Sequence, residues 1–184
     1  MDIAQDAPET VILAEDEAWM YLQATTTYVW SLRGQTPIVA VDPGRTKEGF
    51  YGTLNLHTGE EIVTRTPEFN AAVSAQHLQQ VLDRYPDRPI LLFWDRAPWH
   101  GGDPIRELLA ANPRLEIIKF PTATPDLNPQ ERVWKQTRRV VTHNHLIPKL
   151  PELADRFEGH LNSNTFVSSF LDRYGYNHIC PFLN

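Results

Sequence analysis

The chain has 184 residues, of which 41% are hydrophobic and 22% are charged, a composition typical of one soluble, globular domain rather than a disordered chain. No apolar run approaches the ~18 residues that a membrane span needs, and the net charge of −6 argues against a basic nucleic-acid coat protein. The acidic N-terminus lacks the features of a secretory signal, and the single cysteine, Cys180, cannot form an internal disulfide, so we expect a cytoplasmic protein without membrane contact.

The first part of the chain predicts β-structure after a polar arm at residues 1–9. Five segments combine apolar, aromatic or β-branched residues with turn-forming or polar residues at their ends, as strands do. These predicted strands cover residues 11–14, 25–30, 37–41, 49–56 and 61–64. The first is ended by Glu15-Asp16-Glu17 and the third by Asp42-Pro43-Gly44.

The second part of the chain alternates between helical and extended patterns. The spacing of apolar residues and the positions of Asn, Asp and Pro predict helices at 68–84, 103–112, 128–141 and 149–173, with strands at 89–94 and 115–120. Hairpin strands followed by this alternation predict a single α/β domain over residues 10–184, with a mixed sheet flanked by helices. The order is compatible with a ribonuclease H-like fold.

Charge is unevenly distributed along the chain. Residues 114–149 hold seven basic and three acidic residues, a net charge of +4, which leaves −10 for the rest. If the protein contacts DNA, we expect the contact along this segment; a solvated helix face explains the charge equally well.

Three carboxylates occupy chemically suggestive positions. Asp16 follows the first strand, Asp95 ends the strand at 89–94, and Glu131 lies in the first turn of a helix. Ligands gather beyond the carboxyl ends of strands in such sheets, and oxygen donors suit Mg²⁺ or Mn²⁺. Each acid also has a structural interpretation: Asp16 as a turn residue, Asp95 as a cap, and Glu131 in a capping box with Asn128.

Four sequence blocks surround these acids and occur in a characteristic order. They are AEDEAW (14–19), VWSLRGQTP (29–37), WDRAPWH (94–100) and PTATPDLNPQERVW (121–134). Over roughly residues 11–145 they resemble the DDE domain of mariner-superfamily insertion-sequence transposases. The last block is the most specific, because that family typically carries Ser-Pro-Asp/Glu-Leu-Asn-Pro-Ile-Glu followed by an aromatic residue.

The resemblance implies a ribonuclease H-like fold with Asp16, Asp95 and Glu131 as the catalytic, metal-binding triad. It favours Asp16 over Asp42 as the first acid. It further implies two Mg²⁺ ions, with Mn²⁺ as a substitute, that serve cleavage at transposon ends and joining of the 3′-OH to a target, commonly TA. Full family members carry N-terminal helix-turn-helix modules, which we expect to be absent here. We therefore expect double-stranded DNA as a partner, together with a second copy or a subunit carrying those modules, at the nucleoid.

One position departs from the family pattern. Arg96 stands where the family usually has Asn, and a guanidinium there would compete with the ions or contact a DNA phosphate. The alternative function is therefore a non-catalytic remnant or partner subunit that binds DNA or a full-length transposase. A free-standing nuclease of the same fold is a third interpretation, disfavoured by the 121–134 block.

Further residues are candidates for contacts with DNA or with the site. His100 is expected to contact a phosphate or to orient the second metal ligand, and the helix at 128–141 presents basic residues near the Glu131 face. These helix candidates are Lys135, Arg138 and Arg139. Packing roles are expected instead for Trp19, Trp30, Trp99 and, on the other helix face, Val133, Trp134, Thr137, Val140 and Val141.

Overall fold

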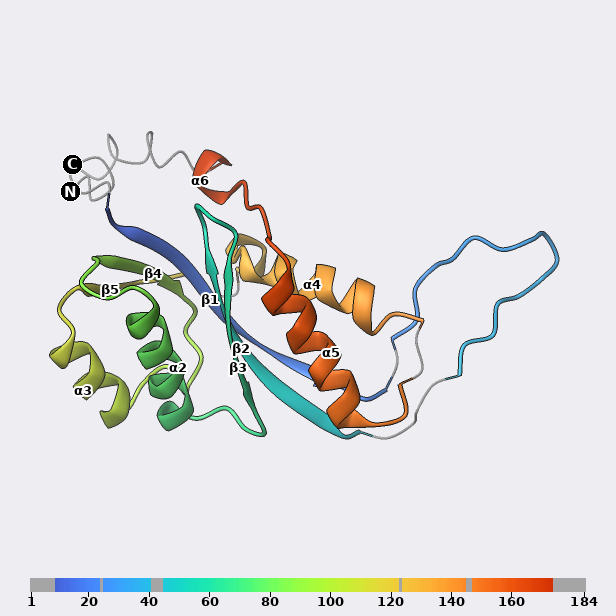
Figure 1. The fold of residues 1–184 in the computed structure, drawn as a ribbon, viewed down its shortest axis with the longest axis horizontal. Helices are drawn as coiled ribbons and strands as arrows, with labels where there is room; N and C mark the ends of the chain where they lie inside the picture. Colours follow the sequence, from blue (N-terminus) through green and yellow to red (C-terminus); the bar gives the residue numbers. More distant parts are fainter. Residues whose placement is uncertain (1–8, 24, 41–44, 123, 145–146, 174–184) are drawn as a thin grey trace.

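The computed structural model describes residues 9–23, 25–40, 45–122, 124–144 and 147–173. Its centre is a five-stranded sheet in the order β3-β2-β1-β4-β5 (Figure 1). The strands are β1 (Val11–Tyr21), β2 (Lys47–Asn55), β3 (Glu61–Thr66), β4 (Ile90–Trp94) and β5 (Leu115–Lys119). β2 pairs antiparallel with both β1 and β3, whereas β4 pairs parallel with β1 and β5 pairs parallel with β4. The predicted mixed sheet is therefore confirmed.

Helices cover both faces of this sheet. They are α2 (Ala71–Arg84), α3 (Asp103–Ala111), α4 (Gln130–Val141), α5 (Leu150–Ser163) and the short α6 (Phe170–Arg173). α2 and α3 pack on one face, and α4 and α5 pack on the other (Figure 1). Within the described residues, no helix is both long and apolar enough to cross a membrane.

β1 divides the core into two layers because its side chains alternate between the two faces. Leu13 joins the cluster under α2 with Leu78 and Leu92, while Ile12 joins the cluster under α4 and α5 with Trp134. All five side chains are buried. Burial of each side chain stabilises the fold by roughly 1.5–3 kcal/mol. β1 is thus held between the two layers as the central strand of the sheet, and the candidate site is built on it.

Two predicted strands are absent. Residues 26–40 contain no regular secondary structure and extend away from the sheet as an arm (Figure 1); Val41 lies outside the described residues. The base of the arm is tied to the residues after α4, since Asn144 N donates to Thr25 O over 2.9 Å. Trp30 is fully exposed, so the packing role expected for it is wrong. Apolar and β-branched composition alone does not provide a neighbouring strand to pair with.

Smaller differences concern helix boundaries and faces. The sequence predicts that Asp103 caps the helix at 103–112, but the N-cap of α3 is Gly102. The predicted helix at 149–173 is interrupted between α5 and α6. Val140 is exposed, although the other four residues assigned to the packed face of α4 are buried.

Candidate active site

Asp16 and Asp95 are brought level by the parallel pairing of β1 and β4. The last pair in this ladder is Ala14 with Phe93, so two further residues along each chain lead to Asp16 and Asp95. The sequence predicted that the first strand ends just before Asp16, but in the structure Asp16 lies inside β1. The strand continues because β2 pairs with it as far as Tyr21, beyond the point where β4 stops.

Helix α4 brings the third carboxylate to the same place. Trp134 Nε1 donates a hydrogen bond to Asp16 Oδ2 over 3.1 Å, and Asn128 Nδ2 donates to Glu15 O over 3.0 Å. These bonds hold the start of α4 against β1. Glu131 lies one turn before Trp134, on the same side of the helix, and its side chain is exposed beside Asp16.

The capping box that would give Glu131 a purely structural role is not formed. Asn128 Oδ1 accepts a hydrogen bond from Gln130 N over 3.1 Å. Within the described residues the Glu131 carboxylate makes no hydrogen bond to the start of α4. The carboxylate is therefore free of the helix backbone and turned toward Asp16.

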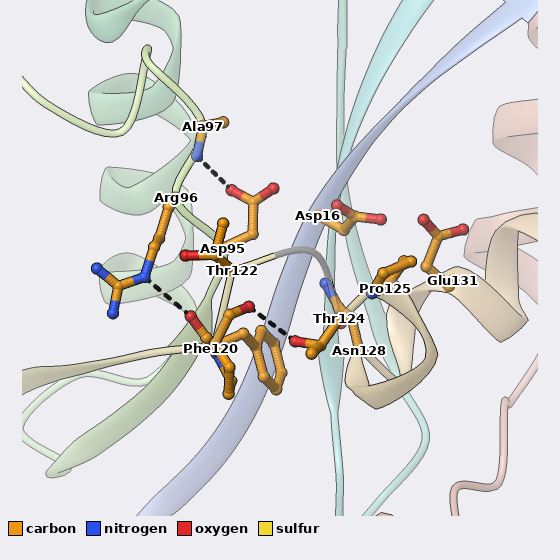
Figure 2. Close-up of a pocket in the computed structure, with 11 residues that line it drawn as sticks. Asp16, Asp95, Arg96, Ala97, Phe120, Thr122, Thr124, Pro125, Asn128 and Glu131 are labelled. Atoms are coloured by element: carbon orange, nitrogen blue, oxygen red, sulfur yellow. Dashed lines mark hydrogen bonds between the residues drawn. The ribbon is translucent and has the colours of Figure 1, made fainter.

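Asp16, Asp95 and Glu131 line one cavity of about 290 Å³, together with residues of the 120–125 loop. Figure 2 shows Asp16 between the other two carboxylates, which come from the end of β4 and the start of α4. Carboxylate oxygens from three separate elements form a donor set that suits hard divalent cations.

The two aspartates have opposite electrostatic environments. Burial, followed by repulsion from Glu131, raises the pKa of Asp16 to about 8. Burial would also raise the pKa of Asp95, but hydrogen bonds from His100 and from Ala97 N outweigh it, and that pKa is lowered. Without a metal, the site holds a proton on Asp16 at neutral pH, while Asp95 is ionised.

His100 orients the Asp95 carboxylate through a direct contact. Its Nδ1 lies 2.8 Å from Asp95 Oδ1, its Nε2 lies 2.6 Å from Glu17 Oε1, and its ring stacks on Trp94. The His100 side chain is only 1% exposed, which does not fit a contact with a DNA phosphate and fits the other expected role, orientation of a ligand carboxylate. Burial lowers the pKa of His100, but its bonds to Asp95 and Glu17 raise it to about 9.

Sequence reasoning missed Glu17. The signal was available, because residues 15 and 17 of a strand face away from residue 16. In the structure Glu17 accepts hydrogen bonds from Trp99 Nε1 and His100, on the α2 side of the sheet.

The basic candidates differ in exposure. Lys135 and Arg139 are exposed on α4, but Arg138 is partly buried and its Nη2 donates to Trp19 O over 3.4 Å. Burial lowers the pKa of Arg138. Arg96 lines the cavity, yet its Nε donates to Phe120 O over 3.1 Å and its guanidinium is turned away from the carboxylates (Figure 2). Asp42 lies outside the described residues.

Comparison with known proteins agrees with this geometry. A protein-family model described as DDE superfamily endonuclease matches residues 11–154. A curated relative, the "Insertion element IS630 uncharacterized 39 kDa protein" of Shigella sonnei, is 27% identical over 150 residues, which make up 80% of this chain and 43% of the relative.

Solved structures of Mos1 transposase share the fold. The Mos1 paired-end complex with the left transposon end superposes with a TM-score of 0.69 at 15% identity, over 89% of this chain and 53% of the Mos1 chain. The catalytic domain of Mos1 mariner transposase gives a TM-score of 0.60 at 13% identity, over 95% and 79%. The ribonuclease H-like fold is thereby confirmed. The chain spans about half the length, or less, of the curated relative and of the transposase in the paired-end complex.

Proposed function

Because the chain belongs to the DDE superfamily endonuclease family, we propose that it cleaves phosphodiesters at transposon ends and joins the 3′-OH to target DNA. The observation that carries this proposal is the cavity shared by Asp16, Asp95 and Glu131, three carboxylates that the fold gathers from β1, the end of β4 and α4.

The three carboxylates would hold two Mg²⁺ ions, or Mn²⁺ in their place. The fit rests on the all-oxygen donor set and on the raised pKa of Asp16, which reflects its burial first and then the negative charge of the neighbouring carboxylates, which cations would relieve. When bound, such ions stabilise the attacking and leaving oxygens of a phosphodiester displacement. The chain itself orients Asp95 through His100 and Ala97 N, and orients Asp16 through Trp134.

Double-stranded DNA would approach from the open side of the cavity. Lys135 and Arg139 are exposed on α4, the helix that carries Glu131, and Arg96 lies at the cavity wall with its guanidinium turned outward. We assign these three side chains to phosphate contacts. Arg138 borders the same surface, but its contact with Trp19 gives it a structural role as well. TA is the target dinucleotide proposed for the joining step.

The proposal includes a second copy of the chain, or a partner that supplies helix-turn-helix modules for recognition of the ends, acting at the nucleoid. The arm supports a protein partner, because Tyr28, Trp30 and Ile38 are each at least 95% exposed. Exposed apolar side chains gathered on one segment are typical of an interaction site. An arm that reaches a second copy would bury them.

Nicking of supercoiled plasmid with Mn²⁺ at low salt tests the chemistry without requiring the end sequence. Asp95→Asn and Glu131→Gln should each abolish nicking, because each removes a carboxylate that would hold the ions. Glu116→Gln, a change at an exposed residue of β5, should leave nicking intact. If Glu131 only capped the helix, the protein would tolerate Glu131→Gln, because Gln retains most of the capping ability of Glu. Absence of metal-dependent nicking by the parent chain, with no Mn²⁺ binding in calorimetry, would favour the non-catalytic partner instead.

A further inference from the structure

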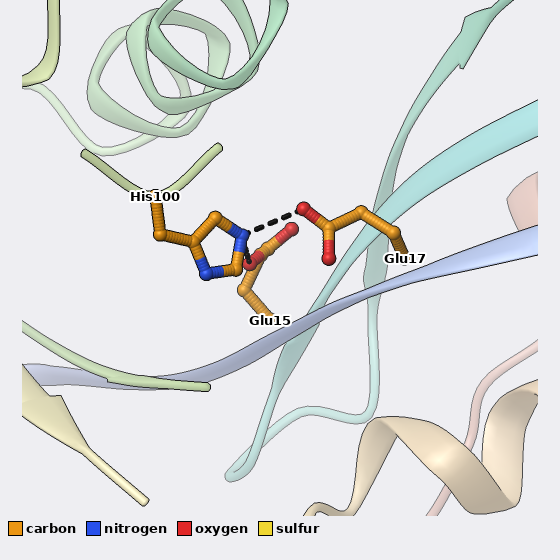
Figure 3. Close-up of side chains that lie close together, drawn as sticks. All are labelled: Glu15, Glu17 and His100. Atoms are coloured by element: carbon orange, nitrogen blue, oxygen red, sulfur yellow. Dashed lines mark hydrogen bonds and ion pairs between the residues drawn. The ribbon is translucent and has the colours of Figure 1, made fainter. Parts of the chain in front are cut away.

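A second group of metal-binding side chains lies on the opposite face of β1. Glu15, Glu17 and His100 each offer one ligand atom, and these atoms lie within 4.8 Å of one another. Figure 3 shows both carboxylates converging on one ring nitrogen of His100, Nε2. Since side chains alternate along a strand, Glu15 and Glu17 face the α2 layer while Asp16 faces α4.

Glu15 is the observation that points to a ligand. Its side chain is 1% exposed, and neither carboxylate oxygen makes a hydrogen bond of normal geometry within the described part of the chain. Burial raises the pKa of Glu15, and the nearby indole of Trp94, whose Nε1 also lacks a partner of normal geometry, only partly opposes this. The one charged contact of Glu15 is His100 Nε2, 3.6 Å from Oε2. That nitrogen already lies 2.6 Å from Glu17 Oε1, so a single imidazolium faces two buried carboxylates. A buried carboxylate without hydrogen bonds is costly, and a coordinated cation removes that cost.

His100 is oriented for coordination. Its Nδ1 lies 2.8 Å from Asp95 Oδ1, which is the carboxylate–histidine arrangement that commonly supports a metal-binding histidine. When Nδ1 carries the hydrogen, Nε2 is left to bind an ion after releasing its own proton. Ligand atoms around tetrahedral Zn²⁺ lie about 3.3 Å apart. The 2.6 Å and 3.6 Å separations at Nε2 therefore need only small side-chain rotations to reach that geometry.

We propose that Glu15, Glu17 and His100 form a Zn²⁺ site distinct from the Asp16–Asp95–Glu131 cavity. An imidazole with two carboxylates favours Zn²⁺ over Mg²⁺, which prefers oxygen ligands and retains its waters. Asp95 bridges the two sites: it binds His100 through Oδ1 and lines the cavity with the rest of its carboxylate. An ion at the Zn²⁺ site would hold His100, and through it Asp95, in place.

The test separates this site from the proposed catalytic one. The reference protein is the double variant Asp16→Asn/Glu131→Gln, which lacks two carboxylates of the cavity and keeps all three Zn²⁺ ligands. Its zinc content after purification without chelator is measured by mass spectrometry, and its Zn²⁺ affinity is measured by calorimetry. We expect close to one Zn²⁺ per chain. Because nicking activity is not read, the outcome is independent of whether the chain is a transposase.

Adding Glu15→Gln to the reference protein should weaken Zn²⁺ binding by more than the ~10–100-fold that loss of an outer partner causes. Glu61→Gln is the matched control, because Glu61 is a carboxylate with one buried oxygen that lacks a partner, but it contacts Gln130 rather than His100. Zn²⁺ absent from the reference protein, or bound equally after Glu15→Gln, would overturn the proposal and leave a proton on Glu15. If Glu15→Gln does not fold, Co²⁺ added to the reference protein decides. Visible absorption of four-coordinate Co²⁺ supports the site, and its absence overturns it.

Discussion

Gly52 lies opposite Asp16 in the β1–β2 ladder, and its missing side chain makes room for α4. A Cβ at this position would lie 2.5 Å from Cη2 of Trp134, the residue that donates its hydrogen bond to Asp16. It would also meet Gln130 and Glu61. The close approach of α4, and with it the position of Glu131, therefore depends on a glycine in the neighbouring strand.

Gly52→Ala should displace the start of α4 from the sheet. We expect a loss of about 1–3 kcal/mol in the free energy of unfolding, as for other overpacked cores, and a larger loss of Mn²⁺ affinity than this destabilisation explains, because Glu131 moves away from Asp16. Denaturant unfolding and calorimetry measure the two effects. Gly159→Ala is the control, since a Cβ there would meet nothing within 4 Å. A folded Gly52→Ala protein with parental Mn²⁺ affinity would contradict this account.

Asp16→Asn should stabilise the metal-free protein at high pH. The pKa of Asp16 is raised from 3.8 to about 8, so the folded state binds the proton more tightly than the unfolded state between these values. Stability from this group is present below about pH 4 and is lost as pH rises toward 8. Relative to Asp16→Asn, the parent should lose on the order of 2–4 kcal/mol between pH 5 and pH 8. Urea unfolding in EDTA at the two pH values measures this difference.

Asp95→Asn is the control for Asp16→Asn, because its effect on the free energy of unfolding should have the opposite sign. The pKa of Asp95 is lowered, and the ionised carboxylate accepts hydrogen bonds from His100 and Ala97 N. Removing that charge should destabilise the metal-free protein at pH 7, by about 1 kcal/mol after allowance for partial exposure. Equal effects of the two substitutions would show that burial of Asp16 and repulsion from its neighbouring carboxylates do not set the stability of the site.

Charge reversal at Lys135 and Arg139 together should weaken DNA binding and lower the slope of log K against log salt by about two units, near one for each lost phosphate contact. Both side chains are exposed, so the melting temperature should be unchanged. Arg106→Glu on α3, across the sheet from α4, is the matched control and should leave the slope as it is. Arg138 is not changed in this test, because loss of its hydrogen bond to Trp19 O could destabilise the fold as well as weaken DNA binding. A slope that does not change would place the DNA elsewhere.

Arg96→Ala should reduce DNA affinity without changing Mn²⁺ affinity. The guanidinium is held by Phe120 O, and no ion pair joins it to Asp95 within the described residues. We expect the salt slope to fall by about one unit and the calorimetric Mn²⁺ affinity to stay at the parental value. A clear gain in Mn²⁺ affinity would instead identify Arg96 as a competitor of the metal, the role that its departure from the family pattern first suggested.

Much of this structure could be predicted from local sequence. The helical spacing in α2 and α4 follows from periodicity, because burial of one face of a helix imposes a period of 3.6 residues. The strands predicted at 49–56, 61–64 and 89–94 correspond to β2, β3 and β4, although most of β2 is buried on both faces of the sheet. The positions of Asp16, Asp95 and Glu131 near strand ends and a helix start made them candidates, but only the resemblance of the surrounding blocks to a known family favoured them as a set.

Only the tertiary structure decided which strand each segment pairs with and which side chains become buried. β1 runs past Asp16 because β2 offers it hydrogen bonds, while residues 26–40, of similar composition, have no strand to pair with and remain exposed. The buried imidazole of His100 contacts Asp95, which is five residues away in sequence, and Glu17, which is distant in sequence. Pairing and burial depend on the surface that another part of the chain presents, and a local pattern carries no information about that surface.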